Sequence, residues 1–229
     1  MEFKEALKNV LDELEPSLDK EIAKELRRYF MENSEQIEKL LVESFPSDEE
    51  LRQRIEESLD RKKLSKEEYH LEKEHLEKLL IQGMTQAEAL NVDHKVLDGL
   101  YSLGYSHYNH GKYREAQTFF CYLTLLNDKD PKYFFAAGAA FHMQKDYMTA
   151  IGYYTICSYL DWMNPLPWFH LADCYYEIKD FPMALTSLEN VFIRTKNSKM
   201  YAKLYDRAKF FKERIIQKID ESLKVGEGS

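Results

Sequence analysis

The chain has 229 residues, and its 32 Lys and Arg against 40 Asp and Glu give a formal net charge of −8. This acidity argues against binding to nucleic acids and to anionic membrane surfaces, because both need a basic protein surface. Only 8 Gly and 6 Pro are present, too few for the many turns of a β-sandwich or barrel, so the composition favours an all-α fold.

Residues 1–63 combine many charges with apolar residues at helical spacing, which predicts a charged helical extension. Its last helix is expected to begin after Ser47, where Ser47 and Glu50 form a capping box, and to carry the apolar row Leu51, Ile55 and Leu59. The first residues are acidic where a signal peptide is basic, and no stretch approaches 18 uninterrupted apolar residues. We therefore expect a cytoplasmic protein that does not insert into the membrane, with its three Cys as free thiols.

Two further capping boxes, Ser65 with Glu68 and Thr85 with Glu88, predict leading helices within residues 65–91. Gly83 is expected at the C-terminal end of the first of them. From about Asp93 the charge density falls and the aromatic density rises. We place a domain boundary near residue 63 and expect a second domain over residues 64–229.

An internal period of 34 residues runs through residues 97–197 and predicts three helical hairpins, over 97–130, 131–164 and 165–197. Five columns of small, aromatic or apolar residues recur in register: Gly104, Gly138 and Ala172; Ala116, Ala150 and Ala184; Tyr113, Tyr147 and Phe181; Phe120, Tyr154 and Leu188; Leu123, Cys157 and Val191. The equivalent turn inside each hairpin is marked by Gly111, Lys145 and Lys179. This pattern resembles the tetratricopeptide repeat, in which small residues let helix A approach helix B and the hairpins stack into a solenoid. The apolar residues of 198–223 predict a helix that caps the last repeat.

In a tetratricopeptide solenoid the A helices line the concave face, and here they carry many of the 16 Tyr and 13 Phe. Packing does not demand aromatic rings on that face, so we predict a binding site for a partner protein. Lys132 is the only obvious cation on this face, and the face becomes acidic toward its end, so the expected ligand is an extended apolar peptide with Leu and Pro side chains. The expected peptide-binding residues are Tyr101, Tyr105, Tyr108, Asn109, Lys132, Phe135, Ala139, His142, Met143, Phe169, Asp173 and Tyr176.

Motifs of enzymes and cofactor sites are missing from the sequence. There is no phosphate-binding Gly-rich loop, no GxSxG and no HExxH, so neither catalysis nor a cofactor is expected. His107, His110 and His142 raise a metal site as an alternative, but no carboxylate or Cys spacing supports one. We therefore expect no bound metal.

Residues 100–161, the preceding Gly83-Met84-Thr85 and the third repeat with Ala172 and Cys174 together resemble the class II chaperones of bacterial type III secretion. The resemblance covers about residues 64–197. It implies a bacterial cytoplasmic chaperone that holds the pore-forming translocators of the secretion apparatus as extended segments until export. It also implies a homodimer through the helices before the first repeat, near residues 65–90. The matching pocket positions are Tyr101, Tyr105, Tyr108, Phe135, Ala139 and His142, with Phe169 beyond them.

Residues 1–63 depart from the pattern of that family, whose members have only a short stretch before the leading helices. The extension replaces the usual dimer contact, covers the end of the groove, or binds another secretion component. The alternative function is therefore a tetratricopeptide scaffold or adaptor in a secretion-related complex that docks through this extension.

Overall fold

The computed structural model describes residues 47–196 and 198–226, with side chains as far as Glu221. It also describes a few earlier residues: Glu5, Lys8, Leu11, Asp12, Lys24, Arg27, Arg28, 30–36 and Lys39. Most of the helical extension predicted before residue 47 lies outside the described residues. Within them the chain forms helices and no β-strand, which confirms the predicted all-α fold. The chain divides into two compact units, Met1–Met84 and Thr85–Ser229.

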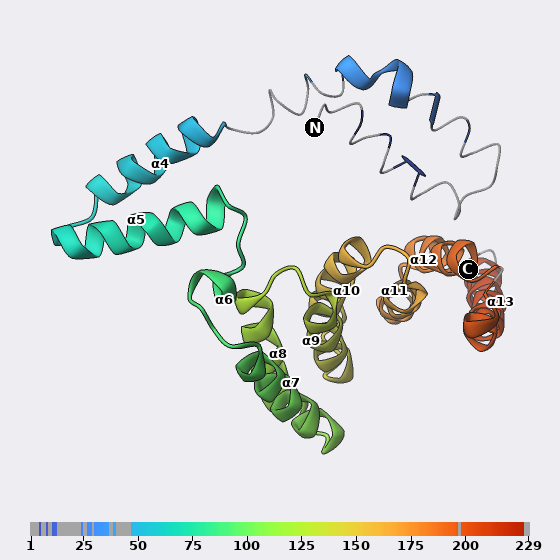
Figure 1. Ribbon diagram of the computed structural model, residues 1–229. Helices are drawn as coiled ribbons and strands as arrows, with labels where there is room; N and C mark the ends of the chain where they lie inside the picture. The colour runs from blue at the N-terminus through green and yellow to red at the C-terminus, as the bar shows by residue number, and fades with distance from the viewer. Residues whose placement is uncertain are drawn as a thin grey trace. The chain divides into compact units, whose positions relative to one another are not determined.

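The first unit contains two neighbouring helices, α4 (Asp48–Asp60) and α5 (Lys66–Leu80), that lie side by side (Figure 1). Both begin with the predicted capping box. The Ser47 backbone N–H donates to Glu50 at 2.7 Å, and the Ser65 backbone N–H donates to Glu68 at 2.8 Å. These contacts satisfy backbone donors that a helix start otherwise leaves without partners, so both helix starts are fixed by local sequence.

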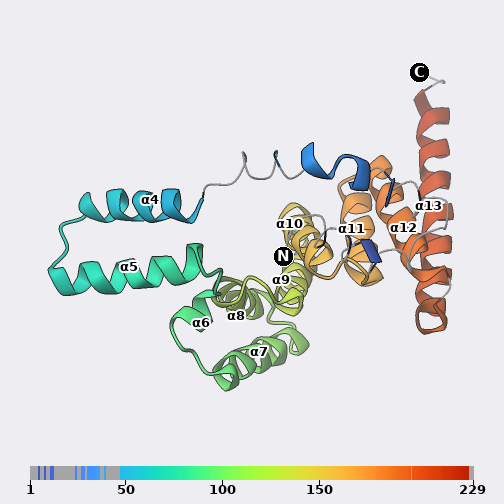
Figure 2. The ribbon, with the colours of Figure 1, turned by 45° about the horizontal axis from the view of Figure 1, so that its top comes forward.

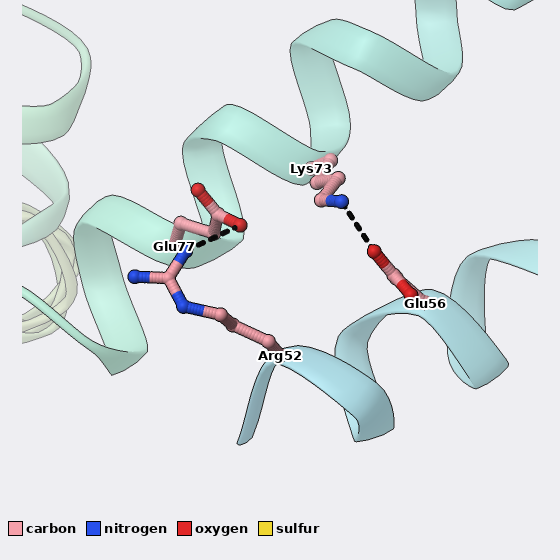
Figure 3. Close-up of polar contacts among 4 residues, drawn as sticks. All are labelled: Arg52, Glu56, Lys73 and Glu77. Carbon is pink, nitrogen blue, oxygen red and sulfur yellow. Dashed lines mark hydrogen bonds and ion pairs between the residues drawn. The ribbon is translucent and has the colours of Figure 1, made fainter. Parts of the chain in front are cut away.

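Two ion pairs join α4 to α5, as Figure 3 shows. Arg52 Nη1 lies 3.1 Å from Glu77 Oε1, and Lys73 pairs with Glu56. On the same hairpin, Ile55 and Leu59 of the predicted apolar row are buried. Because α5 pairs with α4 in this way, it belongs to the first compact unit, whereas the predicted domain boundary lies near residue 63. The assignment of domains 1–63 and 64–229 stays a prediction.

The second unit is a row of helical hairpins that Figure 2 shows side by side. Each hairpin pairs an A helix with a B helix, and each B helix also contacts the next A helix, which confirms the three predicted repeats. The helices are α6 (Gln86–Ala89), α7 (His94–Asn109), α8 (Tyr113–Leu126), α9 (Pro131–Met143), α10 (Tyr147–Leu160), α11 (Pro165–Glu177) and α12 (Phe181–Thr195).

Close contact between A and B helices depends on the predicted small residues. A Cβ atom on Gly104 would lie 2.8 Å from Phe120 Cε1, and one on Gly138 would lie 2.9 Å from Tyr154 Cδ1. Both distances are too short for ordinary van der Waals contact. Opposite them, the B-helix column Ala116, Ala150 and Ala184 is completely buried. The interpretation of both columns as close-packing positions is confirmed.

The turn between the two helices of each repeat places one residue in the left-handed region. Gly111 has φ +73°, Lys145 φ +62° and Lys179 φ +65°. These are the three residues that the period marks as equivalent turns, so the register of the repeats extends to the backbone. Only glycine adopts this conformation without steric cost, and the two lysines adopt it against that cost.

After a short 3₁₀ turn (Lys199–Tyr201), the chain ends its described part with α13 (Ala202–Gly226). The buried residues Leu204, Ala208 and Ile215 of α13 join the core cluster that contains Ala172 and Leu188 of repeat three. This packing confirms the predicted capping helix.

Candidate functional site

The A helices α7, α9 and α11 present the predicted binding residues in three columns with the 34-residue period. The columns are Tyr101, Phe135 and Phe169; Tyr105, Ala139 and Asp173; Tyr108, His142 and Tyr176. Asn109 and Met143 follow at the exposed C-terminal ends of α7 and α9, and Lys132 stands in the first turn of α9. We call these twelve residues the A-helix face.

A pocket of about 260 Å³ lies at the start of this face and brings three predicted residues together. The Tyr101 ring stacks on Tyr105 with centroids 6.3 Å apart, and Lys132 Nζ lies 4.6 Å from the centroid of the Tyr101 ring. Sequence reasoning missed the other five lining residues, which come from the first turns of α9 and α11, from α10 and from the loop between α10 and α11. The full lining is Tyr101, Pro131, Lys132, Phe135, Cys157, Asp161, Asn164 and Leu166.

Exposure differs among the rings of the face. Tyr105 is 53% exposed, and no other aromatic ring of the A-helix face reaches that value. The column Tyr108, His142 and Tyr176 packs instead against the turn aromatics Tyr113, Tyr147 and Phe181, with ring centroids 5.2, 5.6 and 5.8 Å apart. The expectation that packing does not demand these rings is therefore wrong for Tyr108 and Tyr176, because each closes the hairpin of its own repeat.

His170 occupies the centre of the face, although sequence reasoning did not select it. Its ring centroid lies 5.3 Å from that of Phe135, 5.2 Å from Tyr154 and 6.0 Å from His142. Burial lowers the pKa of His170 to about 4. The 34-residue period was the available signal, since it places this imidazole in the column where the earlier repeats have Ser102 and Ala136.

A polar contact between an imidazole and a carboxylate crosses from repeat two to repeat three on this face. His142 Nε2 lies 3.4 Å from Asp173 Oδ2. The hydrogen bond from His142 lowers the pKa of Asp173 against the opposing effect of its burial. Asp173 therefore stays a carboxylate whose charge is stabilised by a hydrogen bond from His142, so the predicted acidic end of the face keeps this negative charge.

The far end of the face is also covered by two arginines from α13. The Arg207 guanidinium lies 4.9 Å from the Phe169 ring centroid, and that of Arg214 lies 5.0 Å from the Tyr176 ring centroid. Such cation–π contacts hold Arg side chains over aromatic rings. The expectation that Lys132 is the only cation of the face is therefore wrong, because α13 contributes charge as well as the cap.

Two other classes of site are absent from the described part of the chain. No three His, Cys, Asp or Glu side chains there come together as ligands for a metal ion. Among the same residues, no helix has the length and apolar character needed to cross a membrane.

Comparison with known proteins finds a family model that matches two of the repeats, and relatives and solved structures that cover part of the chain. The tetratricopeptide repeat family profile matches residues 97–130 and 131–163. Chaperone protein SicA of Salmonella typhimurium is 27% identical over 122 residues, which are 53% of this chain and 74% of SicA. A type III secretion complex from Aeromonas hydrophila matches with a TM-score of 0.61 and 27% identity, over 63% of this chain and 97% of the other.

A third match is the Yersinia enterocolitica type III secretion chaperone SycD, in a structure with a peptide of the translocator YopD. It has a TM-score of 0.53 and 28% identity, over 56% of this chain and 97% of SycD. Both solved chains are covered almost completely, whereas a large part of the present chain has no counterpart in them.

Proposed function

We propose that this chain, a class II chaperone of type III secretion built on tetratricopeptide repeats, holds an extended segment of a hydrophobic translocator on its A-helix face. Binding there keeps the translocator soluble and competent for secretion. The observation that carries the proposal is the pocket formed by Tyr101, Lys132 and Phe135 beside the exposed ring of Tyr105. SycD, a translocator chaperone of similar fold, binds a translocator peptide.

The chemistry of the pocket suits an apolar peptide side chain with its backbone. The rings of Tyr101 and Phe135 supply apolar walls, and Leu166 lies with them. Asp161 in the same lining uses Oδ2 to accept from Asn164, and its Oδ1 is an acceptor for a peptide N–H, which an extended segment leaves available. Tyrosine gives a large contact area at low entropic cost, so Tyr101 and Tyr105 fit a recognition role.

The similarity to known chaperones supports a binding role without catalysis, carried out in the bacterial cytoplasm. The relatives found are chaperones with a helical-repeat fold. A translocator must be kept from aggregating between its synthesis and its export, and a groove that covers its apolar segment performs that task without a chemical step.

The proposal is tested by co-expressing the full chain with each candidate translocator and measuring how much soluble translocator co-purifies. Tyr105→Ala together with Phe135→Ala should remove most of it, because each truncated ring in a binding pocket costs about 1–3 kcal/mol. Tyr159→Ala is the matched control, since that ring is 76% exposed on α10. Equal recovery with the double variant, with its helical content intact, would refute the assignment of the site.

A scaffold or adaptor function that docks through residues 1–63 is the second candidate. The separate compact unit that contains α4 and α5 favours it, because a chaperone groove does not require such a unit. Deleting residues 1–63 should then abolish assembly with other secretion components while translocator binding continues. Loss of translocator binding alone would leave the adaptor function without support.

A further inference from the structure

The capping helix α13 has a second side that does not face the core of repeat three. Tyr205, Lys209 and Ile216 on this side line a pocket between α13 and α12. The pocket measures about 560 Å³, and its lining comprises Glu189, Phe192, Ile193, Lys196, Tyr205, Lys209, Lys212, Glu213 and Ile216. We call it the α12–α13 seat.

The order of helices explains why a pocket lies there. Each A helix packs against the B helix that follows it, and α13 follows α12 as α11 follows α10. The structure describes no helix after α13, so the A-like helix α13 stands without the B helix that completes every earlier repeat (Figure 2). The α12–α13 seat is the space in which such a B helix would pack.

The register of the repeats supports the same conclusion from the α12 side. Glu189 and Phe192 stand two 34-residue periods after Cys121 and Thr124. In repeat one this pair faces the next B helix, where Tyr153 Oη of α10 lies 3.3 Å from Cys121 Sγ and also bonds to Thr124. The matching positions on α12 therefore present the surface that receives a following B helix.

The side chains of the seat specify an amphipathic occupant. Phe192, Tyr205 and the 62% exposed Ile193 provide apolar surface, and Ile216 adds to it at the other end. Exposed apolar surface of this kind in register with a repeat is typical of a partner site. Tyr205 and Ile216 are eleven residues apart, about 16 Å along the helix axis, which matches roughly three turns of a docked helix.

The charges of the seat favour an acidic occupant. Three lysines stand against two glutamates in the lining. Lys212 is already paired with Glu189 at 2.5 Å, whereas Lys196 and Lys209 form no ion pair among the described residues. Glu213 adds the second carboxylate of the lining, so three lysines against two glutamates leave one net positive charge, which favours carboxylates on an incoming helix.

We propose that the α12–α13 seat binds an amphipathic α-helix of a partner protein that carries carboxylates beside its apolar stripe. The helix occupies the place of a fourth B helix and extends the solenoid by one element. The site uses none of the twelve residues of the A-helix face, so it operates whether or not that face binds a translocator.

The test is fluorescence anisotropy of the full chain with a labelled synthetic peptide. The probe has the sequence of residues 181–195 with Arg194→Glu, which reproduces a B helix of this solenoid and leaves it acidic. We expect saturable binding that weakens with added salt. Ile216→Glu should weaken it about tenfold or more, because it places a carboxylate in the apolar part of the seat. Phe210→Glu is the matched control, since Phe210 lies on the same helix, is 70% exposed and is absent from the lining.

A charge swap gives a second, independent readout that does not depend on apolar packing. Lys209→Glu in the chain should weaken binding of the acidic probe. The same substitution should strengthen binding of a basic probe, which is the peptide of residues 181–195 with Glu189→Lys and with Arg194 retained. Tyr105→Ala should leave both affinities unchanged, because it alters the A-helix face alone.

Four results would overturn the proposal. The first is no binding to the wild-type chain up to about 1 mM peptide, which is a binding free energy of about −4.1 kcal/mol. The second is an equal loss of peptide affinity with Phe210→Glu and Ile216→Glu, and the third is a loss of peptide affinity with Tyr105→Ala. The fourth is a dimer of the chain in light scattering that Ile216→Glu dissociates. The last result would assign the seat to a second copy.

Discussion

His142 Nε2 of α9 lies 3.4 Å from Asp173 Oδ2 of α11, and this contact links the A helices of two successive repeats. His170 lies beside this pair, with its ring centroid 6.0 Å from that of His142. The centre of the A-helix face is thus a polar cluster enclosed by aromatic rings. The protonation of His170 is therefore coupled to the packing of repeats two and three.

The stability of the fold should fall as the pH is lowered from 6.5 toward 4. His170 is half-buried among aromatic rings, and its pKa is lowered to about 4 by desolvation and by the neighbouring His142 and Arg207, against the opposing effect of Asp173. In the unfolded chain its pKa returns to about 6.5, so the unfolded chain binds the proton more readily over this range. Well above pH 6.5 neither state binds this proton, so His170 has no effect on the free energy of unfolding there. By pH 4 the preferential protonation of the unfolded chain lowers that free energy by roughly 3 kcal/mol.

Urea unfolding at a series of pH values measures this slope. In His170→Phe, which keeps an aromatic ring in place, the slope between pH 6.5 and 4 should become clearly shallower. Asp173 affects the free energy of unfolding at lower pH than His170 does, because its pKa in the folded chain lies below the usual value of an aspartate. An unchanged slope in His170→Phe would contradict the assignment to His170.

Substitution of two glycines on the same helix should have opposite effects. In Gly104→Ala the new Cβ would meet the ring of Phe120 at 2.8 Å, and such overpacking costs about 1–3 kcal/mol. Gly99→Ala is the matched control, because nothing lies within 4 Å of a Cβ there and alanine raises helix propensity by about 1 kcal/mol. Thermal unfolding should show a lower Tm for the first variant and an equal or higher Tm for the second. Similar Tm values would contradict the close approach of α7 to α8.

The apolar row of α4 should stabilise the α4–α5 hairpin more than its ion pairs do. Exposed pairs such as Arg52 with Glu77 contribute about 0.2–1 kcal/mol, whereas truncating a fully buried Leu costs about 2–5 kcal/mol. Hydrogen exchange of the α4 and α5 amides in the full chain should therefore accelerate strongly in Leu59→Ala and little in Arg52→Ala. Stronger acceleration in Arg52→Ala would show that the ion pair dominates.

Local features of the fold could be predicted because short segments determine them. The capping boxes at Ser47 and Ser65 need only a hydroxyl and a glutamate three residues later. The turn at Lys145 could be predicted from a period that aligns it with Gly111. Features of this kind depend on residues within one helix or one repeat, so a sequence pattern is enough.

Contacts between repeats could not be predicted in the same way. His170 becomes central only because Phe135 and Tyr154 of the preceding repeat enclose it. Arg207 reaches Phe169 from a helix that the sequence indicates only as a cap. Such contacts are set by the angles between helices, which the spacing of residues does not specify.

The central claim, that the A-helix face holds the translocator, is tested most directly by site-specific photo-crosslinking in cells that produce the full chain and its translocator. A photoreactive phenylalanine replaces Tyr105 in one strain and Leu125 in another; Leu125 is 73% exposed but lies on the B helix α8. We predict a crosslinked chaperone–translocator product from position 105 and none from position 125. A product from position 125 with none from position 105 would contradict the account.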